Sequence, residues 1–285
     1  MRLRSLLFVP GDRPQRMEKA KTSGADALIL DLEDSVAPSR KEDARKFVAD
    51  FLCRTKGECI RFVRINPLSG GWASGDLEAV IPCAPDGIVL PKCDGAHSVR
   101  ALDECLSRLG DRFPPVLPIA TETPRSVFQL GSYGEVGGRL AGLTWGVEDL
   151  STAVGAQSAR ESDGTLSEPY RFVRTLALLG ARAADVAAIE TVFPALNDAA
   201  GLDRYARQGW RDGFTGMMAI HPDQVAVINS AFTPTPEALE HARAVVALFE
   251  ANPGAGVLAL DGKMVDAPHL KQAMRLLNAR DSGVE

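Results

Sequence analysis

Two apolar segments, PVLPIATE at 115–122 and LAGLTWGVED at 140–149, follow one another along the chain, and each ends in a carboxylate, Glu122 and Asp149. If both segments are strands of one parallel sheet, the two carboxylates reach the same rim, where parallel α/β folds place their chemistry. Oxygen-only ligation favours Mg²⁺ or Mn²⁺, with water and substrate oxygens completing the octahedron. The alternative is that the two acids cap helices or form ion pairs.

Further along the chain in both directions, short apolar segments recur with helical stretches between them. Including the two quoted above, these segments lie at 5–9, 27–32, 59–65, 87–91, 116–120, 140–145, 187–193 and 214–220. Eight strand candidates that alternate with helices predict a TIM (β/α)₈ barrel, and unbroken apolar runs are typical of strands buried on both faces. A doubly wound open sheet accounts for the same alternation, but a count of eight favours a closed barrel. We expect the barrel to occupy residues 1–230 and a C-terminal helical lid or oligomerisation segment to occupy residues 231–285.

The composition excludes several classes of protein. The chain has 285 residues, of which 45% are hydrophobic and 24% charged, and its net charge is −5. No apolar run approaches the roughly 18 residues that span a bilayer, and the net charge offers no global attraction to nucleic acid or to a membrane. No glycine-rich dinucleotide or P-loop motif is present. A small-molecule substrate is therefore expected.

The first residues and the cysteines bear on location. Residues 1–9 begin like a signal peptide, but Pro10 ends the apolar run early, so we expect a first strand there. Five cysteines without a C-x-x-C pair indicate neither a disulfide framework nor a zinc site, and they favour a reducing, cytoplasmic location. The four histidines form no ligand pattern, which argues against a histidine-ligated metal.

The second strand ends in the acidic sequence DLED at 31–34. Alternation aims Asp31 and Glu33 in one direction and leaves Asp34 at the junction of strand and loop. Crowded carboxylates near a cation have separated pKa values, so that one can act as a base while another orients metal-bound water. The alternative is a solvated loop.

Two basic residues follow the third and fourth strands. Arg64 lies two residues after Phe62, on the same face of the strand. It offers a planar donor to a substrate carboxylate or to a developing oxyanion, and the alternative is that it is paired with Asp31 or Glu33. Lys92 comes directly after the fourth strand, where it is either a Schiff-base lysine of a metal-free aldolase or, as is more common, an ion-pair partner.

The first loop leads into a helix with a basic stripe. Asp12 is expected to cap this helix, and Arg13, Arg16 and Lys19 recur every three residues on one helical face. The stripe begins beside the same rim. It either holds the phosphates of a nucleotide-bearing carrier such as coenzyme A or is a solvated charged face.

Seven motifs occur in order: SLLFVPGDRPQR, LILDLEDSVAPSRKEDAR, RFVRIN, ATETP, WGVEDLSTAVGA, GFTGMMAIHPDQ and GKMVDAPHLKQA. Together they resemble the citrate lyase β-subunit-like, or CitE-like, branch of the HpcH/HpaI aldolase superfamily, from the first strand to the last helix. The resemblance implies a TIM barrel, Mg²⁺ at Glu122 and Asp149, Arg64 at the substrate, and reversible carbon–carbon cleavage of a 3-hydroxy-acyl thioester. In the hydroxy-acid aldolase branch the DLED position ends in a histidine base, whereas this chain has Asp34, so its proton chemistry is expected to differ.

The resemblance also gives a role to the C-terminal segment. The CoA lyases of the family carry an aspartate in a G-x-M-[IV]-D-x-P motif that reaches into a neighbouring subunit's site, and residues 262–268 match it. Asp266 is therefore the candidate acid/base at the α-carbon of the thioester. The same comparison implies a homo-oligomer, commonly a trimer or hexamer.

The implied function is a Mg²⁺-dependent lyase that cleaves or condenses citryl-, malyl- or citramalyl-CoA, with acetyl-CoA and a 2-oxo acid as products. In this mechanism Mg²⁺ binds the oxo-acid half, Arg64 stabilises oxygen charge, and Asp266 protonates the departing enolate. Three alternatives stay open: the citryl-carrier-protein lyase subunit of a multi-subunit citrate lyase, a malyl-CoA thioesterase, and a binding protein without catalysis. The basic stripe and the complete C-terminal motif favour free CoA esters.

Overall fold

The computed structural model describes residues 1–110 and 112–281, and the chain divides into two compact units. The larger unit is Leu3–Asn229, and the smaller unit combines Met1–Arg2 with Ser230–Glu285. Each unit is described by itself below.

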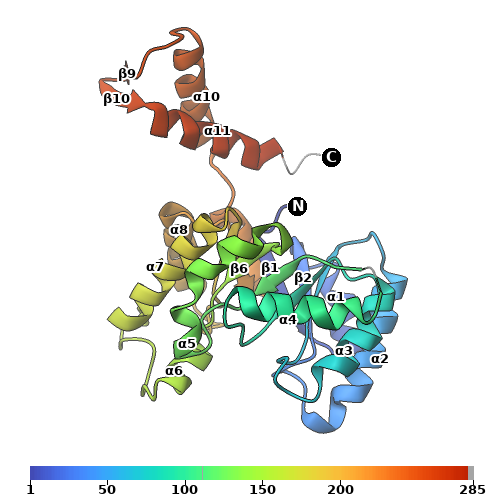
Figure 1. The fold of residues 1–285 in the computed structure, drawn as a ribbon. Coiled ribbons are helices and arrows are strands. Elements are labelled where there is room, and N and C mark those ends of the chain that lie inside the picture. Colours follow the sequence, from blue (N-terminus) through green and yellow to red (C-terminus); the bar gives the residue numbers. More distant parts are fainter. Residues whose placement is uncertain (111, 282–285) are drawn as a thin grey trace. The chain divides into compact units, whose positions relative to one another are not determined.

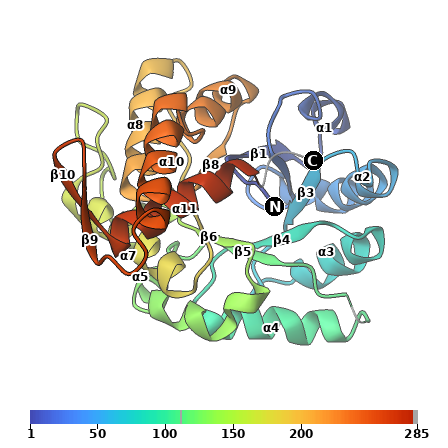
Figure 2. The ribbon, with the colours of Figure 1, turned by 90° about the horizontal axis from the view of Figure 1, so that it is seen from above.

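Eight parallel strands form the centre of the larger unit (Figures 1 and 2). They are β1 (Ser5–Pro10), β2 (Ala27–Asp31), β3 (Ile60–Arg64), β4 (Gly87–Leu90), β5 (Val116–Pro118), β6 (Gly142–Thr144), β7 (Ala187–Glu190) and β8 (Gly216–Ala219). Their order is β5-β4-β3-β2-β1-β8-β7-β6, and each strand coincides with one of the predicted segments. Backbone hydrogen bonds join the two ends of this series, from Ala141 N to Val116 O at 2.8 Å and from Ala120 N to Thr144 O at 2.9 Å. The predicted TIM barrel is confirmed.

Helices follow the strands and surround them, as the view from above shows (Figure 2). The α-helices are α1 (Pro14–Ala20), α2 (Lys41–Arg54), α3 (Ala73–Val80), α4 (Ala96–Ser107), α5 (Pro124–Val127), α6 (Glu148–Ala153), α7 (Glu168–Ala183), α8 (Ala199–Asp212) and α9 (Pro222–Ala231). The 3₁₀ helices are η1 (Pro38–Arg40), η2 (Ile81–Cys83) and η3 (Leu130–Arg139). Helix α2 illustrates the packing, because Ala44, Val48 and Phe51 recur at helical spacing and are buried. Across the described parts of the chain, no helix combines the length and apolarity needed to cross a membrane.

The barrel interior is packed with apolar side chains at alternate strand positions. Ile29, Phe62 and Val89 are fully buried members of this cluster. Because strand residues alternate between faces, Asp31 follows Ile29 and Arg64 follows Phe62 onto the same inner face. A charged layer therefore covers the apolar core at the carboxyl ends of the strands.

The cysteines depart from expectation. Cys53 of α2 and Cys83 of η2 form a disulfide, with their Cα atoms 5.0 Å apart, while Cys59, Cys93 and Cys105 are free. The expectation of no disulfide is wrong. The two partners are brought together by the packing of α2 against η2, which cysteine spacing along the chain does not reveal.

The smaller unit is a helical pair with a hairpin between its helices. Its elements are α10 (Pro236–Glu250), β9 (Val257–Leu260), β10 (Lys263–Asp266) and α11 (Ala267–Asp281). The two strands are antiparallel, and the turn residues Asp261 and Gly262 both have positive φ, 51° and 75°. An Asp-Gly turn with both residues in the left-handed region is the usual two-residue hairpin connection. Val265 of β10 packs into a small core with Ala242, Val245 and Ala273.

Candidate active site

The two carboxylates that end the quoted segments lie after neighbouring strands of the barrel. Glu122 lies between β5 and α5, and Asp149 lies in the first turn of α6, just after β6. Neither accepts a capping hydrogen bond: Thr123 caps α5, and α6 begins after Val147 without a side-chain cap. The helix-capping alternative therefore does not describe this pair.

A tie between the ends of β5 and β6 shapes the surroundings of Glu122. The Thr121 hydroxyl accepts a hydrogen bond from Gly146 N at 3.1 Å and donates one to Gly146 O at 3.2 Å. The backbone of Gly146 thereby comes so close that a Cβ at this position would lie 2.8 Å from Glu122 Cγ. Only glycine leaves Glu122 undisturbed here.

Glu122 is a buried carboxyl group with both acidic and basic side chains near it. Its side chain is 4% exposed, and Oε2 accepts a hydrogen bond from the Lys92 backbone N–H. Burial, together with the nearby charges of Glu33 and Asp149, raises the pKa of Glu122 to about 8. An oxygen-only donor set with surplus negative charge fits a hard divalent cation. Within residues 1–110 and 112–281 no three Asp, Glu, His or Cys side chains are grouped as metal ligands, so the pair itself is the protein's candidate donor set.

Arg64 forms a bidentate ion pair with Asp31 at the inner face of the rim. Its Nε and Nη2 lie 2.7 Å from the two oxygens of Asp31, and its Nη1 lies 2.9 Å from Glu33. The guanidinium also stacks on Phe8, with 4.8 Å between Cζ and the ring centroid. Burial disfavours the charged form of both side chains, but the attraction between their opposite charges is stronger. The pKa of Arg64 is therefore raised, and the pKa of Asp31 is lowered. The ion pairs expected as an alternative are thus present, and they fix the guanidinium on the rim.

The two acids after β2 differ in environment. Glu33 is 3% exposed, and burial, helped by Asp34, raises its pKa against the opposing effect of Arg64 and Lys92. The Asp34 side chain is 58% exposed and lies 3.8 Å from Arg64. Carboxyl groups with different surroundings suit different proton-transfer roles.

Lys92 joins several of these carboxylates. Its Nζ lies 2.7 Å from Glu33 Oε1 and 3.8 Å from Asp149 Oδ1. Burial lowers its pKa, but Glu33 more than compensates, so the net shift is upward. A Schiff base needs a neutral amine, whereas this amine is held as an ammonium. The structure favours the ion-pair interpretation.

Lys41, which is not among the residues expected from the sequence, organises the loop after β2. Its buried Nζ donates hydrogen bonds of 2.7 Å to Leu32 O, Glu33 O and Asn66 Oδ1. These bonds fix the backbone that carries Glu33. The spacing offers one signal: Lys41 lies three residues before Ala44, on the buried face of α2, whereas Lys46 lies off that face and is exposed.

The basic stripe is exposed on the first helix. Arg13, Arg16 and Lys19 are all exposed, while Met17 and Ala20 of α1 are buried. The helix starts just after the carboxyl end of β1, so the stripe begins at the rim. The expected cap was wrong, because Arg13 is the N-cap residue and no side chain caps α1. Asp12 instead lies 3.4 Å from Arg13 Nε.

Asp266 lies in the smaller unit, at the end of β10 and directly before α11. Its Oδ1 is 2.5 Å from Nδ1 of His269, and this hydrogen bond lowers the pKa of Asp266. His269 was not expected as a partner of Asp266, although side chains three residues apart at the start of a helix lie within reach of each other.

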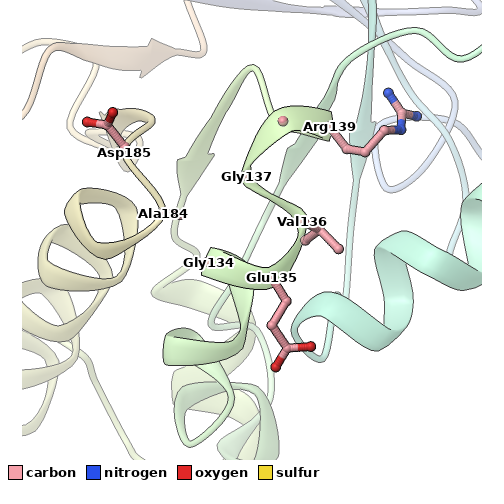
Figure 3. A pocket seen from close by; sticks show the side chains of 8 residues that line it. Gly134, Glu135, Val136, Gly137, Arg139, Ala184 and Asp185 are labelled. Atoms are coloured by element: carbon pink, nitrogen blue, oxygen red, sulfur yellow. The ribbon is translucent and has the colours of Figure 1, made fainter.

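A groove of about 640 Å³ lies elsewhere on the larger unit (Figure 3). Its lining comes from residues 134–139, which precede β6, and from Ala184 and Asp185, which precede β7. It is therefore at the amino ends of the strands, opposite the carboxylate rim. Arg139 in its wall is paired with Asp103 at 2.8 Å. The geometry favours the rim as the functional site.

A model of the HpcH/HpaI aldolase/citrate lyase family matches residues 4–222. The chain belongs to this family. The match covers the HpcH/HpaI barrel with its rim residues and ends before the smaller unit that carries Asp266.

Relatives in the HpcH/HpaI family extend over almost the whole chain. The mitochondrial citramalyl-CoA lyase of Mus musculus is 31% identical, with 98% of this chain and 86% of that protein covered. The citrate lyase subunit beta of Escherichia coli strain K12 is 34% identical, with 99% and 94% covered. The protein CitE of Mycobacterium tuberculosis, crystallised with magnesium, acetoacetate and coenzyme A, gives a TM-score of 0.80 at 33% identity, with 98% of each chain covered.

Proposed function

We propose that this protein is a Mg²⁺-dependent carbon–carbon lyase that cleaves, or forms, a 3-hydroxy-acyl-CoA from acetyl-CoA and a 2-oxo acid. The observation that carries the proposal is the buried Glu122 near Asp149, with a raised pKa, on the rim of a family barrel that also holds Arg64. The likeness to citramalyl-CoA lyase and to a CitE with bound magnesium, acetoacetate and coenzyme A supports it.

Glu122 and Asp149 are the residues that would hold Mg²⁺, or Mn²⁺ in its place. When bound, the ion supplies Lewis-acid polarisation of the carboxylate and hydroxyl oxygens on the oxo-acid half of the substrate. The raised pKa of Glu122 means that a cation is needed to keep this carboxylate charged near neutral pH.

The chain's own groups then divide the proton and charge work. Glu33 or Asp34 takes the proton of the substrate hydroxyl, and the guanidinium of Arg64 stabilises the oxygen charge that develops. The bond between the hydroxyl-bearing carbon and the thioester α-carbon breaks, and its electron pair passes to the α-carbon. Asp266, donated by a neighbouring protomer, protonates that carbon, and in condensation it removes the same proton.

The carrier and the assembly complete the proposal. Arg13, Arg16 and Lys19 bind the phosphates of coenzyme A, as their exposed position at the rim allows. Residues 231–285 act as a lid and oligomerisation segment in a homotrimer or hexamer, and the protein works in the cytoplasm. The likeness to the citrate lyase beta subunit keeps one rival, a citryl thioester on an acyl-carrier protein.

A panel of thioesters tests the function. Purified protein is supplied with citryl-, malyl- and citramalyl groups, each on coenzyme A and on an acyl-carrier protein, and the products are separated by mass. Acetyl-CoA together with a 2-oxo acid is the expected result for at least one CoA ester. Cleavage on the carrier protein alone favours the rival, and release of free CoA with an intact hydroxy acid favours hydrolysis.

A further inference from the structure

We propose that Lys92 is a positioning residue that keeps Glu33 out of the metal's coordination shell, so that the ion retains two protein carboxylates and leaves positions for substrate oxygens. The inference rests on the proposed function, because it concerns the same metal site.

Lys92 reaches three carboxylates with two different groups. Its backbone φ of 50° lies in the left-handed region, which non-glycine residues seldom occupy. In this conformation its N–H donates to Glu122, while its Nζ lies 2.7 Å from Glu33 and 3.8 Å from Asp149. Strained backbone at a site is often part of how the site is organised.

Glu33 is held by a cation on each oxygen. Its Oε1 contacts the Lys92 ammonium, and its Oε2 lies 2.9 Å from Arg64 Nη1. The side chain is 3% exposed, so water offers it little alternative. It is also close enough to Glu122 for its charge to raise the pKa of that carboxyl group. Glu33 is therefore a third carboxylate near the metal pair, and a cation contacts each of its two oxygens.

Removal of the ammonium changes what Glu33 can contact. Without Lys92 the buried Glu33 carboxylate keeps Arg64 on Oε2 but has no cation on Oε1, and a divalent ion held by Glu122 and Asp149 would supply one. A third carboxylate ligand binds the ion more tightly but occupies a position that substrate oxygens need. Lys92 thus lowers the affinity of the site for the metal and leaves a coordination position open for substrate.

The experiment measures Mn²⁺ binding to the full-length protein by calorimetry and by electron paramagnetic resonance. Lys92→Met should bind Mn²⁺ about tenfold more tightly than wild type, a change opposite in sign to the loss of affinity that follows removal of an ordinary partner of a metal ligand. It should carry about one fewer exchangeable water on the ion and bind pyruvate more weakly. Lys92→Arg, which retains a cation, should match wild type, as should the exposed-lysine control Lys46→Met.

A double variant isolates the role of Glu33. Glu33→Gln alone should leave the Mn²⁺ dissociation constant near that of wild type, and Lys92→Met/Glu33→Gln should lose the tightening. Unchanged or weaker Mn²⁺ binding by Lys92→Met overturns the inference, as does tightening that persists without Glu33. If Lys92→Met fails to fold, Lys92→Gln replaces it with the same expectations. Failure of the proposed metal site is separate: wild-type Mn²⁺ binding would then be insensitive to Glu122→Gln.

Discussion

Glu122 combines burial, a backbone hydrogen bond and nearby charged groups in one side chain. It is buried, it accepts a backbone hydrogen bond from Lys92, and it stands near the charges of Glu33 and Asp149. Without a cation the carboxyl group favours its protonated form up to about pH 8. A divalent ion reverses that preference, because it interacts with the carboxylate form alone.

The first prediction is a pH dependence of stability that belongs to Glu122. Its folded-state pKa of about 8 exceeds the ordinary value of 4.5, so the stabilisation it contributes is complete below pH 4.5 and is lost as the pH rises through 8. In chelator, the free energy of unfolding should therefore fall across this window, and Glu122→Gln should reduce the fall. Saturating Mn²⁺ should stabilise the wild type more at higher pH. An identical pH profile for Glu122→Gln contradicts the assignment.

At the scale of elements, the segments after β5 and β6 meet through Thr121 and Gly146. This contact brings the loop that carries Glu122 beside the start of α6, which carries Asp149. The two carboxylates come from separate strands, so their mutual position depends on that tie.

The second prediction concerns Gly146→Ala. The new Cβ would lie 2.8 Å from Glu122 Cγ, so the carboxylate must shift. We expect Mn²⁺ affinity to fall about tenfold, as is usual when ligand orientation is disturbed. Gly131→Ala is the matched control, since a Cβ there meets nothing within 4 Å. Equal affinities for the two variants would rule out the tie as a determinant of the site.

The third prediction concerns the turn before Asp266. Gly262 has a φ of 75°, which costs an alanine roughly 1 kcal/mol. Gly262→Ala should therefore speed amide hydrogen exchange in β9 and β10. Gly256→Ala, which adds a methyl group in open space, should leave exchange unchanged. Slow exchange in both variants would show that the turn does not govern the hairpin.

At the scale of the whole molecule, the sequence predicts those features that depend on a local pattern of residues, such as the strands and the residues at their ends. Unbroken apolar runs identify the eight strands, and Glu122 and Asp149 are recognisable because each follows one of those runs. The disulfide between Cys53 and Cys83, and the contacts of Lys41 and Lys92, depend on which loops meet in space, so no spacing reveals them. The hairpin of the smaller unit was predictable, since Asp261-Gly262 between apolar segments is a turn signal.

The fourth prediction tests the sharing of sites between protomers. Asp266→Asn and Glu122→Gln should each be inactive alone, because each lacks one half of the site. Mixed and reassembled, they should regain about one quarter of wild-type activity, the share of sites with both halves intact under random pairing. Activity of Asp266→Asn alone would mean that Asp266 has no catalytic role, and no recovery, with mixed oligomers demonstrated, would mean that it does not act across protomers.

The central claim is carbon–carbon cleavage that depends on the carboxylate pair. The most direct measurement is product analysis with citramalyl-, malyl- and citryl-CoA for the wild type, Glu122→Gln and Asp149→Asn, each with Mg²⁺ and with chelator. We expect equal amounts of acetyl-CoA and a 2-oxo acid from the wild type with Mg²⁺, and at least about a hundredfold less in the other samples. Full cleavage in chelator or by both variants, or no 2-oxo acid from any of the three esters, would contradict it.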